Sequence, residues 1–548
     1  MTRLFSIYLD LLRFFAAFMV LLFHSKLLYN PHHTLFNLGH EAVIIFFVLS
    51  GYVIAFTAEN KEKTLKAYAI ARVARIYSVA IPAIFITLLV DTIGFNLLNS
   101  QAYPIGYQVW DLIPVRIISA LVFSGELWGL SIQTFSNVPY WSLNYEVWYY
   151  IGFAALCFVP GKKRFYLFAL VCLIVGPKIL LLMPLWWLGV YLYRSDRLRH
   201  IGLAIATLLL LVSGAGIYSY IHFRIGSWGW DTLEAFMGAE NHKNLAFSRQ
   251  FISDYLLGIF IGMHFVAMRG ICNSLEKFPV WLEKIIRNIA GSTFTLYLTH
   301  MPLLLFYRAA FYEETMSGQK YAFILGLTVV TAYLIARVTE NKKHVWKRWV
   351  QTVFDQVEKY IDRKYGTIRG WVRLFIANLM WRFGPYRKYS HLRKEDVRRL
   401  VFVCHGNICR SPFAHHLMVK LSPDVPVVSI GLSTSTGLEA YPMAIDVAKD
   451  YDVDLESHRA TDLEDFEVRD GDLFLVMEDR HIKKLEPYLQ STDKDVQIAL
   501  LGLWASPRMA LLYDPHRLSR EYFSTCFMRI QQALTSLKKE LGKSDITS

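Results

Sequence analysis

Cysteine and charge are both scarce in this sequence. Only 6 of its 548 residues are cysteine, and charged residues make up 19% of the chain. Three cysteines lie in or near long apolar runs and three lie near the C-terminal end, which excludes the dense disulfide framework of a small secreted protein. We expect no cleavable signal peptide, because the first apolar run contains Asp10 and Arg13 and has no small-residue cleavage site. We therefore expect this run to be a permanent membrane span.

Long hydrophobic runs are abundant before about residue 340. A helix that crosses a bilayer needs about 20 predominantly apolar residues, and ten runs approach or reach this length. They predict a multi-span α-helical membrane domain over residues 1–340. The expected spans are 6–26, 37–57, 73–97, 138–159, 164–178, 179–193, 200–221, 250–268, 287–308 and 319–338.

Positive charge is distributed unevenly around these spans. Basic clusters follow every even-numbered span, for example Arg72 and Arg75 after the second and Arg194 after the sixth. The positive-inside rule then predicts a multi-pass membrane protein with both termini in the cytoplasm. The net charge is +13, and residues 337–399 alone contain 17 Lys and Arg against 6 Asp and Glu. This excess favours an anionic membrane surface as a partner and argues against nucleic acid.

The basic connector, 341–397, contains two amphipathic segments, 346–361 and 371–383. Apolar residues recur there with helical spacing, and charged residues lie between them. We expect an interfacial linker, a helix pair lying on the membrane surface with Trp at headgroup depth. The alternative is a helix that packs on the soluble domain.

Residues 398–548 have the composition of a soluble domain in which strands and helices alternate. Continuous apolar strands that alternate with helices predict an α/β domain with a parallel sheet and helices on both faces. The expected strands are 400–403, 425–430, 473–477 and 496–500, and the expected helices are 412–421, 441–450, 479–488 and 518–541.

The first loop of this domain carries a Cys-x5-Arg motif. Cys404 ends the first strand, and Ser411 with Pro412 gives the start signal of the following helix. Backbone N–H groups and a helix N-terminus form an anion site at such a position. A thiolate at Cys404 would be nucleophilic there, and Arg410 offers a planar fork for a phosphate group.

The motif Cys404–Pro412, with Asp514 and Pro515 further along, resembles the low-molecular-weight protein tyrosine phosphatase family, which includes related arsenate reductases. The resemblance implies that a phosphotyrosine protein is the substrate and that Cys404 attacks phosphorus. It implies that Asp514 acts as general acid and then as general base, and that Ser411 donates a hydrogen bond to the cysteine sulfur.

The same resemblance implies that Arg410 and the backbone of the loop bind phosphate. Asn407 would brace the loop, and Cys409 would serve as a resolving thiol for Cys404. His405 stands where the family more often has a small residue, and we expect it to affect specificity. The phosphate-binding loop residues are then His405, Gly406, Asn407, Ile408 and Cys409. A redox or arsenate-reducing module is the alternative function for this domain.

Polar residues within the apolar runs are the second candidate site. Arg13 and His24 are eleven residues apart, which places them on nearly one face of the first span, about 16 Å apart. Such residues inside a span are costly and usually functional. The others are Arg72 and Arg75 as Arg-x-x-Arg, Glu146 in Trp-Ser-Leu-x-x-Glu, and His300 in the ninth span.

Together with the run Phe46–Tyr52, these elements resemble the membrane-bound acyltransferase 3 family over about residues 5–340. The resemblance implies O-acyl transfer from cytoplasmic acyl-CoA, with acetyl-CoA expected, to a surface polysaccharide or lipid-linked glycan. Arg72 and Arg75 would hold the phosphates of the donor. His24 would be the base or would carry the acyl group.

The remaining polar residues of the spans have less defined roles in this scheme. Arg13 would stabilise an oxyanion or pair with Asp10 or Glu146, and Glu146 and His300 would orient groups or bind substrate. A transporter and a catalytically silent anchor are the alternatives for residues 1–340. No metal and no bound cofactor are expected.

The sequence thus predicts a bifunctional membrane enzyme. We hypothesise that the two activities meet in exopolysaccharide assembly.

Overall fold

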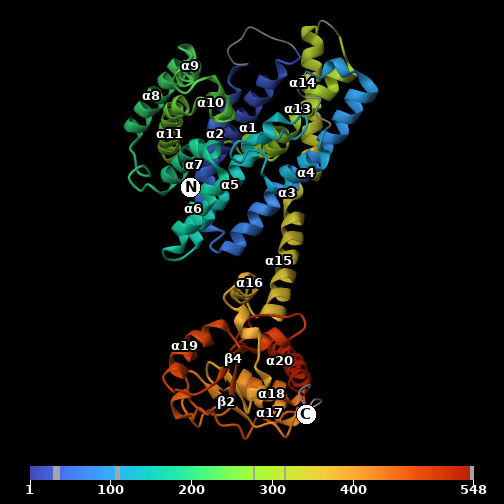
Figure 1. Ribbon diagram of the computed structural model, residues 1–548. Coiled ribbons are helices and arrows are strands. Elements are labelled where there is room, and N and C mark those ends of the chain that lie inside the picture. Colours follow the sequence, from blue (N-terminus) through green and yellow to red (C-terminus); the bar gives the residue numbers. More distant parts are fainter. Residues whose placement is uncertain (29–36, 105–110, 276–277, 314–315, 543–548) are drawn as a thin grey trace. The chain divides into compact units, whose positions relative to one another are not determined.

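The computed structural model describes the chain except for residues 29–36, 105–110, 276–277, 314–315 and 543–548 (Figure 1). It consists of two compact units, Met1–Gln351 and Thr352–Ser548. The division lies inside one helix, α15 (Lys343–Tyr365), and each unit is described by itself.

Helices make up the first unit, and each of the ten expected spans corresponds to one of them. These helices are α1 (Arg3–Ser25), α2 (Gly39–Asn60), α3 (Leu65–Ile93), α5 (Trp141–Phe158), α6 (Lys163–Val175), α7 (Pro177–Arg194), α8 (Leu203–His222), α11 (Phe251–Ser274), α13 (Thr293–Ala310) and α14 (Gly318–Val338). Helices α4 (Ile113–Val122), α9 (Ile225–Met237), α10 (Ala239–Asn244) and α12 (Val280–Ala290) lie between them.

Fewer than ten of these helices are long and apolar enough to cross a membrane. Within the described residues six qualify: α1, α2, α3, α8, α11, and α14 together with α15; the pair α12 and α13, bent by 48°, makes a seventh. Helix α6 has 13 residues, so it is about 20 Å long, short of the roughly 30 Å of a hydrocarbon core. Helices α5 and α7 have 18 residues each and are rich in Tyr and Trp.

Close packing of α2 on α7 fixes the centre of this unit. A Cβ atom at Gly51 would lie 1.9 Å from the carbonyl oxygen of Trp186, and one at Gly189 would lie 2.0 Å from that of Val48. Small residues at such points let two helix backbones approach each other. The approach also brings the indole N–H of Trp186 to 3.1 Å from Ser50 Oγ, so this contact positions part of the site described below.

The second unit contains the expected parallel sheet. Its strands are β1 (Arg399–Cys404), β2 (Val427–Gly431), β3 (Asp472–Val476) and β4 (Gln497–Leu500), in the order β2-β1-β3-β4, and all three pairings are parallel. The register pairs Cys404 with Gly431 and Val403 with Val476. The principal helices after the first strand are α17 (Arg410–Leu421), α18 (Pro442–Lys449), α19 (Asp479–Gln490) and α20 (Arg520–Leu541).

Helix α16 (Ile368–Phe383) of the connector packs on this unit. Leu374 and Ala377 are buried in the same core as the β1 residues. The opposite side of the helix leaves Phe375 and Phe383 exposed. The alternative of a helix packed on the soluble domain therefore describes one face of α16, and its other face remains apolar and open.

Candidate active sites

The Cys-x5-Arg loop connects the carboxyl end of β1 to the N-terminus of α17. Cys404 is buried at the end of the strand, and its Sγ accepts a hydrogen bond of 3.1 Å from the hydroxyl of Ser411. Helix α17 begins at Arg410, so the loop N–H groups precede a helix N-terminus, where anions are stabilised. Two of the predicted residues therefore already meet at the sulfur atom.

Asn407 stabilises the loop through its backbone conformation and the hydrogen bonds of its side chain. Its φ of 49° lies in the left-handed region, which Asn tolerates better than most residues. Its amide nitrogen donates to Ser411 Oγ at 2.8 Å and to Ser429 Oγ at 3.0 Å, and its amide oxygen accepts from the backbone N–H of Thr461 at 2.9 Å. The side chain is fully buried, so Asn407 braces the loop and does not face the cavity.

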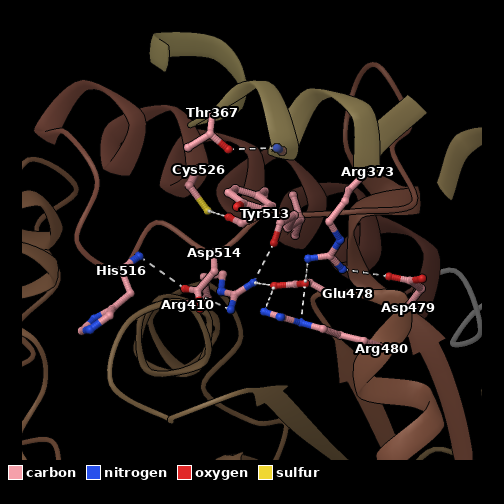
Figure 2. Close-up of polar contacts among 12 residues, drawn as sticks. Thr367, Arg373, Arg410, Glu478, Asp479, Arg480, Tyr513, Asp514, His516 and Cys526 are labelled. Atoms are coloured by element: carbon pink, nitrogen blue, oxygen red, sulfur yellow. Dashed lines mark hydrogen bonds and ion pairs between the residues drawn. The ribbon is translucent and has the colours of Figure 1, made fainter. Parts of the chain in front are cut away.

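Arg410 is 1% exposed and lies at the centre of a charged cluster (Figure 2). One terminal nitrogen donates to Glu478 at 2.5 Å and to the carbonyl oxygen of Leu512 at 2.8 Å, and the other is 3.1 Å from Asp514 Oδ1. Its Nε has no hydrogen-bond partner within the described residues. A buried donor without a partner is costly, and an oxyanion in the adjacent cavity would satisfy it.

A cavity of about 470 Å³ gathers the predicted residues. Its mouth carries His405, which is exposed, and His516, whose ring packs edge-on against Tyr441 at 4.6 Å between centroids. Residues 433–438 form a wall that the sequence did not indicate. The lining residues are Cys404, His405, Gly406, Ile408, Cys409, Arg410, Ser433, Thr434, Ser435, Leu438, Asp514 and His516.

The electrostatics of this cavity depend on Glu478, which the sequence reasoning missed. Burial by itself raises the pKa of Glu478, but the Arg410 guanidinium and other nearby cations outweigh it and lower the pKa to about 2. The carboxylate is therefore charged at neutral pH. Burial raises the pKa of Cys409 well above its usual value, so that residue remains a thiol. Glu478 lies two residues after the end of β3, and this position at the carboxyl edge of the sheet was the signal that could have found it.

In the first unit, the two predicted histidines of separate spans are neighbours. His24 Nδ1 lies 3.1 Å from His300 Nε2 and 3.0 Å from the carbonyl oxygen of Val20. His300 Nδ1 lies 3.0 Å from the carbonyl oxygen of Leu296. A carbonyl oxygen only accepts, so the neutral rings satisfy both contacts with protons on their Nδ1 atoms. Nε2 of His24 is then unprotonated.

Glu146 lies deeper in the same unit. It accepts a hydrogen bond of 2.5 Å from Ser50 Oγ and a further one from the hydroxyl of Tyr150. Arg13 and Arg75 line the same cavity as Glu146. Helices α1, α3 and α5 thus bring these three predicted residues together.

Arg72 does not line the cavities that contain the other predicted residues. It is buried and pairs with Glu62 at 2.7 Å. Arg13 is 3.6 Å from Asp10, which also pairs with Arg287 at 3.0 Å. Of the two arginines in the Arg-x-x-Arg motif, Arg75 therefore faces the site and Arg72 does not.

Three cavities follow one another through this unit. The second of them is the cavity that contains Glu146, and it shares Arg13 and Arg75 with the first cavity. It also shares Val43 and Tyr297 with the third cavity, which contains His24. His40 also lines the third cavity, and its Nε2 is 3.0 Å from both oxygens of Asp254. This pair was not predicted, because its members are far apart in the sequence.

Comparison with known proteins gives a family match for each of the two parts of the chain. Residues 6–337 match the family described as acyltransferase domain, and residues 399–546 match the family described as low molecular weight phosphotyrosine protein phosphatase. The low molecular weight protein-tyrosine-phosphatase Wzb of Salmonella typhi is 35% identical over 152 residues, which are 26% of this chain and 97% of the relative. Wzb of Escherichia coli (strain K12) is 33% identical over 147 residues, 27% of this chain and 97% of the relative. The crystal structure of the Erwinia amylovora tyrosine phosphatase AmsI is 27% identical and covers 27% of this chain and 97% of its own, with a TM-score of 0.24.

Proposed function

Because this chain belongs to the acyltransferase family matched over residues 6–337 and, in its C-terminal part, to the low molecular weight phosphotyrosine protein phosphatases, we propose that it couples O-acylation of a surface glycan to phosphotyrosine hydrolysis. The chain is both an acyltransferase and a phosphatase. We assign the phosphatase reaction to residues 398–548 and acyl transfer to residues 1–340, with residues 341–397 as the linker.

In the phosphatase reaction, the Cys404 thiolate attacks phosphorus and the bond to the tyrosyl oxygen breaks. Arg410 and the N–H groups of the loop bind the phosphoryl oxygens, while Asp514 gives its proton to the leaving phenolate. Asp514 then takes a proton from the water that attacks the phosphocysteine, which releases phosphate and restores the thiolate. The observation that carries this assignment is the convergence of Cys404, Arg410 and Asp514 on one cavity.

The leaving group provides the test of this mechanism. We expect Asp514→Asn to reduce kcat/KM for phenyl phosphate by about 10²- to 10³-fold and kcat/KM for a nitrophenyl phosphate much less, because kcat/KM reports the step that forms the phosphocysteine and a good leaving group needs no proton in that step. Steady-state kinetics on the full chain measure both. An equal loss on the two substrates would contradict the role of Asp514. Arsenate reduction by the wild-type chain without aryl phosphate hydrolysis would instead favour the redox alternative.

In acyl transfer, the acceptor hydroxyl attacks the thioester carbonyl of acyl-CoA and the carbon–sulfur bond breaks. We assign His24 as the base that takes the hydroxyl proton through Nε2, with His300 holding the ring in place. Arg13 and Arg75 at the other end of the connected cavities would bind the anionic donor. Glu146 lies between these two ends, where it would orient the acceptor or the donor.

The acyl content of the surface polysaccharide tests this role for His24. We expect His24→Ala to reduce polymer acylation by about 10²- to 10⁴-fold, with the protein level in the membrane unchanged. His222→Ala is a matched control, because His222 is exposed at the end of α8. Full acylation in the His24→Ala strain would favour the anchor reading. Labelled acetyl-CoA supplied to inside-out vesicles would test the donor.

We place the protein in the bacterial inner membrane, with the phosphatase in the cytoplasm. The basic clusters after the even-numbered spans and the open apolar face of α16 support this arrangement, in which the linker lies against anionic lipid. Phosphotyrosine removal would then act beside acylation in exopolysaccharide assembly. A Cys404→Ser strain with unchanged polymer amount and acylation would contradict the coupling.

A further inference from the structure

Helix α16 lies before the residues that match the phosphatase family, yet one of its side chains contacts Glu478, which binds Arg410 of the phosphatase cavity. The family match begins at residue 399, whereas α16 spans Ile368–Phe383. Arg373 of this helix is 2.9 Å from Glu478 Oε2 and 3.3 Å from Asp479 Oδ1 (Figure 2). The connector thus contributes to a cluster that contains Arg410.

Glu478 is the residue through which this contact is transmitted. Its side chain is fully buried, and three guanidinium groups surround it. Oε1 accepts from Arg410 and from Arg480, and Oε2 pairs with Arg373 and with Arg480. Since Arg373 holds Oε2 from the side of α16, Oε1 stays directed at one terminal nitrogen of Arg410. The Nε of Arg410 then remains available to an oxyanion.

A second group of contacts joins α16 to the segment that carries Asp514. The guanidinium carbon of Arg373 lies 5.8 Å from the centroid of the Tyr513 ring, a cation–π distance. Asn378 Oδ1 accepts a hydrogen bond of 2.8 Å from the backbone N–H of Ala510. The same helix therefore contacts both sides of the candidate active site, the Arg410 side through Glu478 and the Asp514 side through Tyr513.

We propose that Arg373 is a positioning residue for the phosphatase reaction, acting through Glu478 on Arg410 and through Tyr513 on Asp514. The family-matched residues therefore form a site whose geometry depends on the connector. This inference rests on the proposed phosphatase function. It also gives the connector a direct influence on the rate of dephosphorylation, because displacement of α16 removes one of the three guanidinium partners of Glu478.

Arg373→Gln in the purified full-length chain tests the proposal. Misplacing a catalytic group by about 1 Å costs on the order of 10²-fold, so we expect kcat/KM for an aryl phosphate to fall by about 10- to 100-fold. We also expect inhibition by vanadate, which occupies the oxyanion site, to weaken by about the same factor. Arg369→Gln is the matched control, because Arg369 is an exposed arginine of the same helix.

Arg373→Lys separates positioning from folding. A lysine keeps the charge beside Glu478 but lacks the fork that also reaches Asp479, so we expect a loss of about three- to tenfold and an intermediate vanadate affinity. If Arg373→Gln does not fold, Arg373→Lys carries the test by itself. Wild-type kcat/KM and wild-type vanadate inhibition in the variant that folds would overturn the proposal, as would a loss of rate with unchanged vanadate inhibition. An inactive wild-type chain would instead refute the proposed phosphatase function.

Discussion

The two candidate sites of this chain are built in different ways. The phosphatase cavity takes half of its lining residues from one short segment, 404–410, which a strand end and a helix start hold in place. The acyltransferase site collects single residues from α1, α2, α3, α5 and α13. A contiguous motif specifies its own geometry, whereas a dispersed site exists only when the helices pack correctly. Different kinds of substitution should therefore inactivate the two sites.

The largest expected effect tests whether they fail independently. We expect Cys404→Ser to reduce phosphatase kcat/KM by at least about 10³-fold, because the residue that forms the covalent intermediate is lost. The rate of acyl transfer in isolated membranes from the same strain should stay within about twofold of the wild type under saturating donor, because the proposed coupling acts through polymer assembly in the intact cell. A parallel fall in the rate of acyl transfer in these membranes would show that the two sites are not separate.

The buried charge cluster predicts a second large effect, on stability at low pH. The pKa of Glu478 is about 2 in the folded chain, below its usual value of 4.5. Its stabilising contribution is therefore complete above about pH 4.5 and is lost as the pH falls toward 2, and the difference corresponds to about 3 kcal/mol. Pepsin proteolysis of the C-terminal unit between pH 5 and pH 2 measures this loss.

Glu478→Gln supplies the control for the acid limb. A glutamine does not titrate, so the variant should be less stable at neutral pH, and its protection against pepsin should change less between pH 4.5 and pH 2. An acid limb as steep as that of the wild type would mean that other carboxylates dominate the acid dependence.

Much of the second unit could be predicted from the sequence because its signals are local. Each predicted strand matches an observed one to within about two residues, and the segment before Ser411 forms the expected loop. Glu478 escaped prediction because 68 residues separate it from Arg410. The position of Glu478 just beyond the end of β3 indicates that it lies near the site only when the parallel order of the strands is also known.

The first unit was less predictable because its contacts join distant parts of the chain. His24 and His300 were chosen separately, and the 276 residues between them hid their contact. The prediction that Arg72 faces the donor did not anticipate Glu62, which lies only ten residues upstream and holds it. Segment α6 was apolar enough to be predicted as a span but is 13 residues long.

Helix packing gives a smaller effect, confined to the dispersed site. We expect Gly51→Ala to shift α2 against α7, because a Cβ atom there would lie 1.9 Å from a backbone oxygen. Overpacking of this kind costs about 1–3 kcal/mol, and displacement of Ser50 from Glu146 should lower acyl transfer by about tenfold. Gly326→Ala in α14 is the control, since no atom lies within 4 Å of its added Cβ. Phosphatase activity should not change in either variant.

The smallest effect concerns a cysteine inside the contiguous site. Cys409 lines the phosphatase cavity, and burial raises the pKa of its thiol well above the usual value. It therefore stays protonated and does not compete with Cys404 as the nucleophile, so Cys409→Ser should change kcat/KM by less than about threefold under reducing conditions.

After peroxide treatment, we expect the wild type and the Cys409→Ser variant to differ in the activity that they regain. We expect the sulfenic acid of Cys404 to condense with Cys409 in the wild type, releasing water and forming a disulfide that a thiol reductant reopens. The serine variant lacks this protection, and we expect it to regain less activity after reduction than the wild type does. Equal recovery in both chains would show that Cys409 does not act as the resolving thiol.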